Sequence, residues 1–432
     1  MSDRRSFIKS AVFSTIALPL ISPSGSEART LPKANSFVPE FPAQNDPKFW
    51  KNVRKMFPMR EGETYLNNGS LGPMPTPVLD RMIEEMRSSM ENAARFDWSR
   101  EGWPQLVGGI GGDPENRVRE KLAKLIHAET TEVSLTQNST MGHNFIANGF
   151  DLDPGDEIIM TDQEHTGGRC GWQMMEMRKK AVVKMIKIPD PPNDPEVIFK
   201  RFAEAVTPKT RVIAFAHITS SLGIILPAKK ICDMARERGI FTVVDGAHAI
   251  GQIPLDMKDI GCDAYFSSAH KWLLAPAGSG CLYIRNDVAP TVWTTIASGG
   301  WEKENCKDHG NRFTARSCAN QYLAAGFEAA IDFHNQLGPR KVTDRIKYLG
   351  DYFRAGLKKI DKVEIKSSVH PEMCAGMTSY TITGVDSAKL REELWNRKKL
   401  RQRGIRFCTH IYNSVEEIDA SLEVIRDLAK NA

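Results

Sequence analysis

Most patterns that mark a metal site or a disulfide scaffold are missing from this sequence. The eight cysteines are scattered between Cys170 and Cys408, with no Cys-x-x-Cys pair and no zinc-type spacing. No two histidines stand in a His-x-x-x-His pattern. The histidines that could be imagined as ligands of a metal hydrolase are His165, His217, His248 and His270. We therefore expect no metal site, and the spacing predicts no particular disulfide.

The chain also lacks a strong excess of one charge. It has 432 residues and a formal net charge of +5, from 58 Lys and Arg against 53 Asp and Glu. A balance this slight and this evenly spread does not indicate nucleic-acid binding. The basic run at residues 397–403 is a local exception, and it is typical of a solvated helix end. The sequence has no internal repeat and no long segment of low complexity.

The first residues resemble an export signal rather than part of the fold. Arg4 and Arg5 stand in a pattern similar to a twin-arginine signal, and a small-residue stretch ends at Ala28. The uncharged segment between them, Ser10–Ile21, is too short to span a bilayer as a helix. We expect residues 1–28 to be read by the twin-arginine translocation machinery and then cleaved. The mature protein would be periplasmic, with no stable membrane anchor.

After this signal the chain alternates strand patterns with helix patterns. Apolar runs such as Val212–Ala216 and Phe241–Asp245 are separated by helical patterns such as Pro227–Arg238. This alternation is typical of an α/β fold with a mostly parallel sheet flanked by helices. A chain of this length can form two or three domains. We expect an extended N-terminal arm over residues 29–64, a large domain over residues 65–334 and a small C-terminal α/β domain over residues 335–432.

Two neighbouring strands end in side chains that can do chemistry. The run Phe241–Asp245 ends on a carboxylate, and the next run ends in Ser268-Ala-His270-Lys271. Strands buried on both faces read as continuous apolar runs, and ligands bind beyond their C-terminal ends. The polar side chains at these two ends therefore predict a binding or catalytic site.

The residue types at this site suit pyridoxal 5′-phosphate. That cofactor needs a lysine for its Schiff base and a carboxylate that faces its pyridine nitrogen. Asp245 would keep the nitrogen protonated, which makes the ring an electron sink for a carbanion on the substrate. Lys271 would hold the aldehyde until the substrate amine displaces it, and would then shuttle the α proton. Alone, Asp245 would be an ordinary cap and Lys271 an ordinary surface charge.

The ordered motif Asp-Gly-Ala-His at residues 245–248 and Ser-x-His-Lys at residues 268–271 resembles the class V aminotransferase family. The branch that it resembles includes the isopenicillin N epimerases and is similar to the cysteine desulfurases. The resemblance covers nearly the whole mature chain, from about Tyr65 onward. It implies fold type I of the pyridoxal phosphate enzymes, with a seven-stranded type of sheet. It also implies a homodimer whose sites lie at the subunit interface.

The resemblance implies which residues contact the cofactor. The turn at Ser139 and Thr140 takes the place of the family's phosphate-binding Thr-Thr-x-Gly turn, at a helix N-terminus that favours an anion. His165 stands where the family places the residue that stacks on the ring. Ser220 replaces an asparagine that contacts the ring oxygen, so this contact would pass through water. The other implied cofactor contacts are His248, Ser268 and His270, the last two as phosphate donors.

Two arginines and an asparagine are assigned through the same resemblance. Arg316 takes the place of a threonine that reaches the neighbouring subunit's phosphate, which implies either a stronger donor or a different register here. Arg406 lies in a segment similar to the family's Arg-x-Ser-x-His-x-Tyr-Asn motif and would bind the substrate carboxylate through its planar fork. Asn68 lies in a turn similar to the family's Leu-Asn-x-Gly-Ser segment near the active site, and it is assigned to the substrate.

The implied chemistry begins with removal of the α proton, which serves epimerisation, transamination and β-elimination alike. A desulfurase needs a nucleophilic cysteine on a mobile loop, and no cysteine stands between Leu390 and Ile405. Cys374 lies far upstream, and Cys408 falls in an expected strand, where a buried inert thiol is usual. We therefore expect an aminotransferase or an epimerase that acts on an amino acid or a peptide-like amino acid. A C–S lyase without that cysteine and an exported, non-catalytic binding protein of the same fold are the alternatives.

Overall fold

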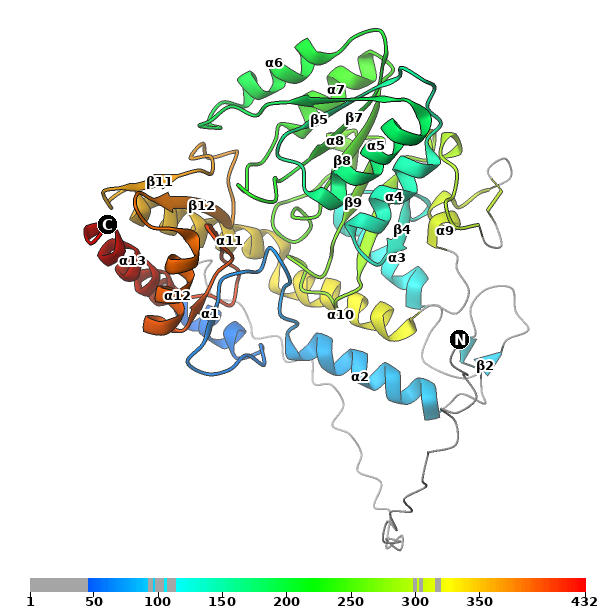
Figure 1. Cartoon of the computed structure of the whole chain (residues 1–432). Helices are drawn as coiled ribbons and strands as arrows, with labels where there is room; N and C mark the ends of the chain where they lie inside the picture. The colour runs from blue at the N-terminus through cyan, green and yellow to red at the C-terminus, as the bar shows by residue number, and fades with distance from the viewer. Residues whose placement is uncertain are drawn as a thin grey trace, which may run out of the picture. The chain divides into compact units, whose positions relative to one another are not determined.

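A sheet of seven strands lies at the centre of the fold (Figure 1). The computed structural model describes residues 46–91, 96–97, 105–106, 114–297, 301–302, 306–314 and 320–432. In order across the sheet the strands are β4 (Val133–Thr136), β10 (Gly280–Ile284), β9 (Ala264–Ser267), β8 (Phe241–Asp245), β7 (Thr210–Ala216), β5 (Glu157–Thr161) and β6 (Val182–Ile186). Strand β10 is antiparallel to both neighbours, and the other pairs are parallel. The expected α/β fold with a mostly parallel sheet is confirmed.

Helices connect the strands and begin at side chains that cap them. Helix α4 (Ser139–Gly149) is capped by Asn138, whose Oδ1 accepts a hydrogen bond from Met141 N, and helix α6 (Pro195–Ala205) is capped by Asp194. The next crossovers are α5 (Thr166–Lys179), α7 (Ala228–Glu237) and α8 (Met257–Ile260). The remaining helices around this sheet are α2 (Thr76–Glu91), α3 (Pro114–Ile126), α9 (His309–Thr314) and α10 (Gln321–Leu337). The helix expected at residues 227–238 is therefore present as α7.

Both faces of the sheet are buried, which explains the continuous apolar runs in the sequence. In β7, Val212 and Ala214 join one apolar cluster, and Ile213 and Phe215 join another. The first cluster also contains Trp172 of α5, so that helix covers one face. Because neither face of the central strands meets water, polar side chains concentrate where these strands end.

The C-terminal part forms a second, smaller sheet. Its strands are β11 (Val363–Ile365), β12 (Met377–Ile382) and β14 (Arg406–Cys408), all antiparallel in the order β11-β12-β14. The helices beside it are α11 (Pro339–Leu357), α12 (Ser387–Lys398) and α13 (Val415–Lys430). An apolar cluster of its own includes Phe353, stacked on Phe407 with ring centroids 3.7 Å apart. The expected limits of the domains, at residues 64/65 and 334/335, stay predictions, because the described residues all belong to one compact unit.

The segment before the first site residues is held by a helix and by the C-terminal part. Residues 47–54, expected as part of an extended arm, form helix α1 (Pro47–Arg54), because Asp46 caps it and Trp50 and Val53 turn into the core. Strand β1 (Thr64–Tyr65) pairs in parallel with β13 (Leu400–Arg401). A further short pair joins β2 (Phe96–Asp97) and β3 (Gln105–Leu106). None of the described helices is long and apolar enough to cross a membrane, and the expected signal at residues 1–28 lies outside the described residues.

Candidate active site

The predicted site residues come together where the parallel strands end. A cavity of about 790 Å³ lies beyond the C-terminal ends of β4, β5, β7, β8 and β9. The predicted residues that line it are Ser139, Thr140, His165, Ser220, Asp245, His248, Ser268, His270, Lys271 and Arg406. Asn68 does not line it, and Arg316 lies outside the described residues. Residues as distant in sequence as Ser139 and Arg406 therefore share one cavity.

Lys271 is paired with a histidine whose tautomer the structure defines. The Lys271 Nζ lies 3.2 Å from His248 Nε2, and Trp272 Nε1 donates to His248 Nδ1 at 3.2 Å. An indole N–H can only donate, so His248 Nδ1 must accept. Burial and the positive charge of Lys271 hold the pKa of His248 well below its usual range. Neutral His248 therefore carries its proton on Nε2, where it can donate to Lys271 when the lysine is in its amine form.

The environment of Lys271 shifts its titration toward the amine. Burial lowers the pKa of Lys271 to about 8, Asp245 opposes this shift, and Arg406 adds to it. A lysine with its ordinary pKa would be almost fully protonated at neutral pH and could not attack a carbonyl. Lys271 therefore has the character of an activated nucleophile.

Asp245 lies at the end of β8 and is buried. Its Oδ1 accepts a hydrogen bond from Ala247 N at 2.8 Å. Burial raises the pKa of Asp245, while that hydrogen bond and Lys271 lower it. Gly168 lies close to Asp245, because a Cβ there would stand 2.7 Å from Asp245 Oδ2. The start of α5 therefore contacts the Asp245 carboxylate, and position 168 has no room for a side chain.

A second carboxylate, Glu164, lies behind Asp245 and was not predicted. Its Oε1 accepts from Thr161 Oγ1 at 2.6 Å and from Ala216 N at 3.2 Å. Burial and the charge of Asp245 raise the pKa of Glu164 to about 8, against the lowering effect of its hydrogen bonds. Glu164 is therefore protonated near neutral pH, which leaves the negative charge on Asp245. The sequence feature that could have identified Glu164 is its position next to His165, just after an apolar strand.

Hydroxyl groups gather at the first turn of α4. Ser139 N donates to Ser268 Oγ at 3.0 Å, and Ser268 Oγ donates to Ser139 Oγ at 3.0 Å. Thr140 lines the cavity beside them. His270 Nδ1 lies 3.2 Å from Ser279 O, so that nitrogen carries a hydrogen. This end of the cavity combines a helix N-terminus with hydroxyl donors, which suits a phosphate.

His165 caps α5 and presents its ring to the cavity. Its Nδ1 accepts from Gly167 N at 3.0 Å. Burial lowers the pKa of His165, and the positive charges of Lys271, Arg403 and Arg406 lower it further. A neutral ring held by its own backbone suits stacking on a flat aromatic group.

Arg406 is buried in β14 and fixed by three acceptors. Its Nη1 donates to the backbone oxygen of Ser220 at 2.7 Å. Its Nη2 donates to Ser70 Oγ at 3.0 Å and to Asn67 Oδ1 at 3.3 Å. Arg406 Nε is buried and has no hydrogen-bond partner among the described residues, while the side chain as a whole lines the cavity. Ser220 thus contributes its carbonyl, and Asn67 and Ser70 are contacts that the sequence did not reveal.

Asn68 is hydrogen-bonded to the backbone of the lysine segment. It is fully buried, its Nδ2 donates to Lys271 O at 3.3 Å, and Tyr412 Oη donates to its Oδ1 at 3.1 Å. Nearby, Gly72 N donates to His270 O at 2.8 Å. Both groups of the Asn68 amide are therefore used inside the protein, and its assignment to the substrate stays a prediction.

Comparison with known proteins decides the family. The family model "Aminotransferase class-V" matches residues 64–424, most of the chain. The chain belongs to the class V aminotransferase family. It is 32% identical over 404 residues to the isopenicillin N epimerase of Amycolatopsis lactamdurans, covering 88% of this chain and 99% of that one. It is 31% identical over 393 residues to that of Streptomyces clavuligerus, covering 86% and 96%. The expected relation to this family and its epimerase branch is confirmed.

Other class V proteins are similar to the chain as well. A probable cysteine desulfurase of Methanothermobacter thermautotrophicus is 27% identical over 410 residues, covering 88% of this chain and 98% of that one. The cystine C–S lyase C-DES, solved with its reaction product cysteine persulfide, has a TM-score of 0.76 and 25% identity, covering 86% and 99%. The apo cysteine desulfurase of Thermococcus onnurineus has a TM-score of 0.77 at 22% identity, covering 91% and 100%, which supports the fold. The fold type I assignment is therefore confirmed.

Pyridoxal 5′-phosphate is the cofactor of this class V protein, and the cavity fits it. An activated lysine and a buried carboxylate, Lys271 and Asp245, share the cavity with the hydroxyl groups at the start of α4. The neutral ring of His165 supplies a flat partner. These are the contacts that a Schiff base, a pyridine nitrogen, a phosphate and an aromatic ring require.

The described cysteines do not reach this cavity. Cys408 is buried in β14, and burial raises its pKa. Cys374 is also buried, and its Sγ donates to His370 O at 3.2 Å. Neither lines the cavity, so neither is placed as the nucleophile of a class V desulfurase. The described cysteines are all free thiols, and the described residues include no group of three or more His, Cys, Asp or Glu arranged to hold a metal.

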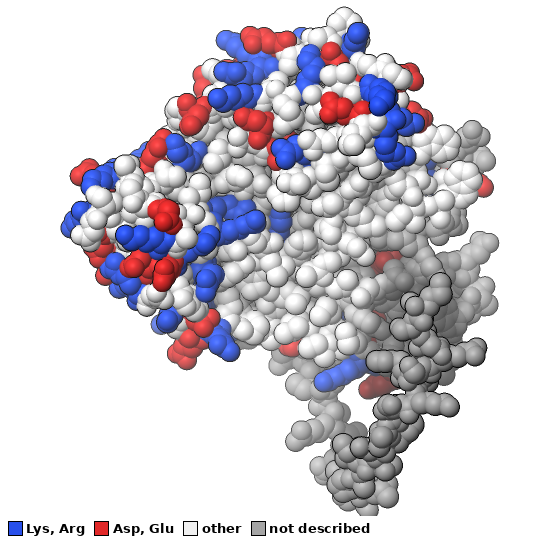
Figure 2. Space-filling model, in the orientation of Figure 1, with Lys and Arg blue, Asp and Glu red and all other residues white. Residues whose placement is uncertain are grey.

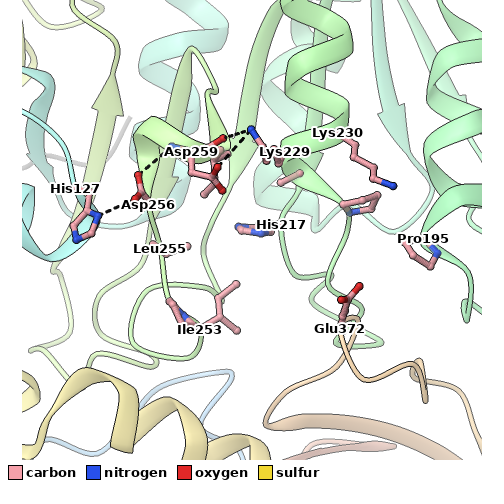
Figure 3. A pocket seen from close by; sticks show the side chains of 14 residues that line it. His127, Pro195, His217, Lys229, Lys230, Ile253, Leu255, Asp256, Asp259 and Glu372 are labelled. Atoms are coloured by element: carbon pink, nitrogen blue, oxygen red, sulfur yellow. Dashed lines mark hydrogen bonds and ion pairs between the residues drawn. The ribbon is translucent and has the colours of Figure 1, made fainter.

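A second pocket, of about 600 Å³, is lined by His217, the last of the four histidines considered above as possible metal ligands (Figure 3). His217 points into this pocket, and its Nδ1 bonds to Tyr265 Oη at 2.9 Å. Two contacts between side chains lie there: His127 Nδ1 with Asp256 at 2.8 Å, and Lys229 Nζ with Asp259 at 3.5 Å. His217 does not line the lysine cavity, and this pocket lacks the activated groups found there.

Proposed function

We propose that this class V enzyme moves a proton at the α-carbon of an amino acid or a peptide-like amino acid, and that epimerisation is its reaction ahead of transamination. The observation that carries the proposal is the Lys271 amine, held by His248 in the same cavity as Arg406. When bound, pyridoxal phosphate withdraws electrons from the α-carbon and makes its proton acidic. Lys271 then takes and returns that proton, and Arg406 holds the α-carboxylate.

The similarity to two isopenicillin N epimerases favours epimerisation. Both match over nearly their whole length, at 32% and 31% identity. Their name points to a peptide-like amino acid as the kind of substrate. The buried positions of Cys374 and Cys408 count against a desulfurase.

Deuterium exchange distinguishes the candidate reactions. The holoenzyme is incubated with separate L- and D-amino acids in deuterated water, and the products are resolved on a chiral column. Epimerisation predicts deuterium at the α-carbon and both enantiomers in the product. Release of a keto acid, with conversion of the cofactor to its amine form, would mean transamination instead. A protein that shows no cofactor band even after pyridoxal phosphate is added would contradict any enzymatic proposal and favour a binding protein.

A C–S lyase is the second candidate. Its support is the 25% identity and the TM-score of 0.76 with the cystine C–S lyase C-DES. Incubation with L-cystine tests it, because β-elimination would release pyruvate, ammonia and cysteine persulfide. Retention of the sulfur with exchange at the α-carbon would exclude this reaction for that substrate.

We also propose that the mature enzyme is a periplasmic homodimer. The support is the twin-arginine pattern at Arg4 and Arg5 and the class V relationship, in which Arg316 would face the partner's phosphate. Light scattering measures the mass in solution. Cell fractionation of the wild type and of an Arg4→Lys, Arg5→Lys variant tests export, and an equal distribution of both in the cytoplasm would contradict it.

A further inference from the structure

The lysine cavity holds more positive charge than one α-carboxylate requires. Three arginines line it: Arg391, Arg403 and Arg406. The carboxylate among its lining residues is Asp245, which lies at the lysine end. On the face drawn in Figure 2, Lys and Arg side chains also gather between the C-terminal elements and the central sheet. The C-terminal side of the cavity is therefore a cationic surface.

Arg403 and Arg406 are held side by side. Ser70 Oγ accepts from Arg403 Nη1 at 3.3 Å and from Arg406 Nη2 at 3.0 Å. Their backbones also pair, with Arg406 N donating to Arg403 O at 2.9 Å across the turn at Gly404, where φ is +56°. One hydroxyl and one short turn thus fix two guanidinium groups beside each other.

Two basic residues of the same segment that do not line the cavity are paired with carboxylates, in contrast to these arginines. Arg397 Nη2 lies 2.6 Å from Asp427, and Lys398 Nζ lies 2.8 Å from Glu423, both on α13. Arg391, on the same helix α12, lines the cavity and makes no ion pair with any residue that the structure describes, and neither does Arg403. Arg401, which does not line the cavity and has no ion pair with a described residue, lies over the Trp395 ring at 4.2 Å instead. Within this segment, Arg391, Arg403 and Arg406 are the arginines that line the cavity, and the structure gives none of them a carboxylate partner among the described residues.

Like charges placed together without a counter-ion repel, so this arrangement suits an anion from outside the chain. The cofactor phosphate does not account for it, because its donors lie at the start of α4 and after β9. Arg406 lines the cavity, and its planar guanidinium group can bind the α-carboxylate by itself. We propose that the substrate carries a second carboxylate on its side chain, which Arg403 and Arg391 bind while Arg406 binds the α-carboxylate. This proposal rests on the proposed function at the α-carbon.

A pair of ligands that differ in the second carboxylate tests the proposal. L-2-Aminoadipate and L-norleucine have the same carbon chain, and the first ends in a carboxylate where the second ends in a methyl group. Binding of each to the holoenzyme is measured by calorimetry and, in parallel, by the visible absorbance of the cofactor. We expect aminoadipate to bind at least about tenfold more tightly, because guanidinium–carboxylate hydrogen bonds are among the stronger ones.

Arginine variants locate the binding group. Arg403→Gln and Arg391→Gln should each weaken aminoadipate binding, with Arg403→Gln costing about tenfold. Norleucine affinity should stay within about twofold of the wild type in both. The matched control is Arg397→Gln, on the same segment but paired with Asp427 outside the cavity, and it should leave both affinities unchanged.

The two readouts separate failure of the subsite from failure of the proposed function. Equal affinities for the two ligands in the wild type would overturn the subsite, and so would an unchanged preference in both arginine variants. A calorimetric preference for aminoadipate that Arg403→Gln removes would support the subsite even if the cofactor absorbance never responds. That last result would count against chemistry at the α-carbon, and it would leave the dicarboxylate preference established.

Discussion

Two charged residues of opposite sign shift the pKa of Lys271 in opposite directions. Asp245 stabilises its ammonium form, and Arg406 destabilises it, while burial favours the amine. The result is a lysine whose pKa is lowered to about 8. The amine fraction therefore changes over the pH range just above neutrality, where an unperturbed lysine would stay protonated.

Substitution of these neighbours should move the titration of Lys271 in opposite directions. Arg406→Gln removes a positive charge, so the pKa of Lys271 should rise above about 8. Asp245→Asn removes a negative charge, so that pKa should fall. The measurement is the pH dependence of the rate at which the apoprotein reacts with pyridoxal phosphate, with midpoint changes of up to about one pH unit. Midpoints that move in the same direction would show that these charges do not control the lysine.

Lys271→Ala should lose both the covalent link to the cofactor and most of the activity. We expect turnover to fall by at least about 10²–10⁴-fold, because the group that moves the α proton is gone. Borohydride reduction followed by mass spectrometry should attach the cofactor to the wild type and not to the variant. The control is Lys230→Ala, an exposed lysine of the second pocket that pairs with Glu196. Attachment of the cofactor in Lys271→Ala would place the Schiff base on another lysine.

At the scale of elements, the turn at residues 67–72 joins two functional parts of the cavity. Strand β1 precedes it and pairs with β13 of the C-terminal part. Asn68 and Gly72 bond to the backbone of the lysine segment, and Ser70 bonds to Arg406. The turn therefore sets where the lysine and the carboxylate-binding arginine lie relative to each other.

Gly72→Ala should disturb this arrangement. A Cβ at Gly72 would stand 2.1 Å from Lys271 O and 2.7 Å from Leu274 Cδ2, so the lysine segment would have to shift. Overpacking of this kind costs about 1–3 kcal/mol. We expect lower stability in urea unfolding and weaker cofactor binding. Leu71→Ala, at the exposed neighbouring position, should change stability by no more than about 0.5 kcal/mol. Wild-type cofactor affinity in Gly72→Ala would contradict this role of the turn.

At the scale of the whole molecule, cofactor binding is linked to the folding of distant segments. The cavity draws on residues from Gly69 to Arg406 and on both sheets. A ligand that contacts only the folded chain stabilises it by mass action. Loss of the cofactor should therefore weaken the whole compact unit rather than one loop.

Removal of the cofactor should lower the melting temperature of the enzyme. At free pyridoxal phosphate about a hundredfold above Kd, the expected stabilisation is about 2.7 kcal/mol. Calorimetric melting of the apoenzyme at increasing cofactor concentrations measures it. Lys271→Ala should retain only a small part of the shift at the same concentrations. A melting temperature that is independent of the cofactor in the wild type would show that the site is not linked to folding.

The order of elements followed from local patterns in the sequence. The apolar runs at residues 212–216 and 241–245 lie in strands β7 and β8, and the break between α10 and α11 falls at Gly338, where φ is +89°. Helix α1 was missed, because a segment rich in Pro, Asn and Lys concealed its capped apolar pattern. Periodicity and capping act over a few residues, so they can be read without knowledge of the fold.

The sequence by itself determined the alternating strands and helices and the cofactor, and it predicted Lys271 and Asp245 as the residues that serve it, because each has a local pattern or motif. Only the tertiary structure decided which groups set the protonation and the position of the site residues. Glu164 lies behind Asp245, Trp272 sets the tautomer of His248, and Ser70 joins Arg403 to Arg406. The arginine contacts link residues more than 300 positions apart. Such long-range contacts leave no local signature in the chain, since they depend on how strand ends, turns and helices meet.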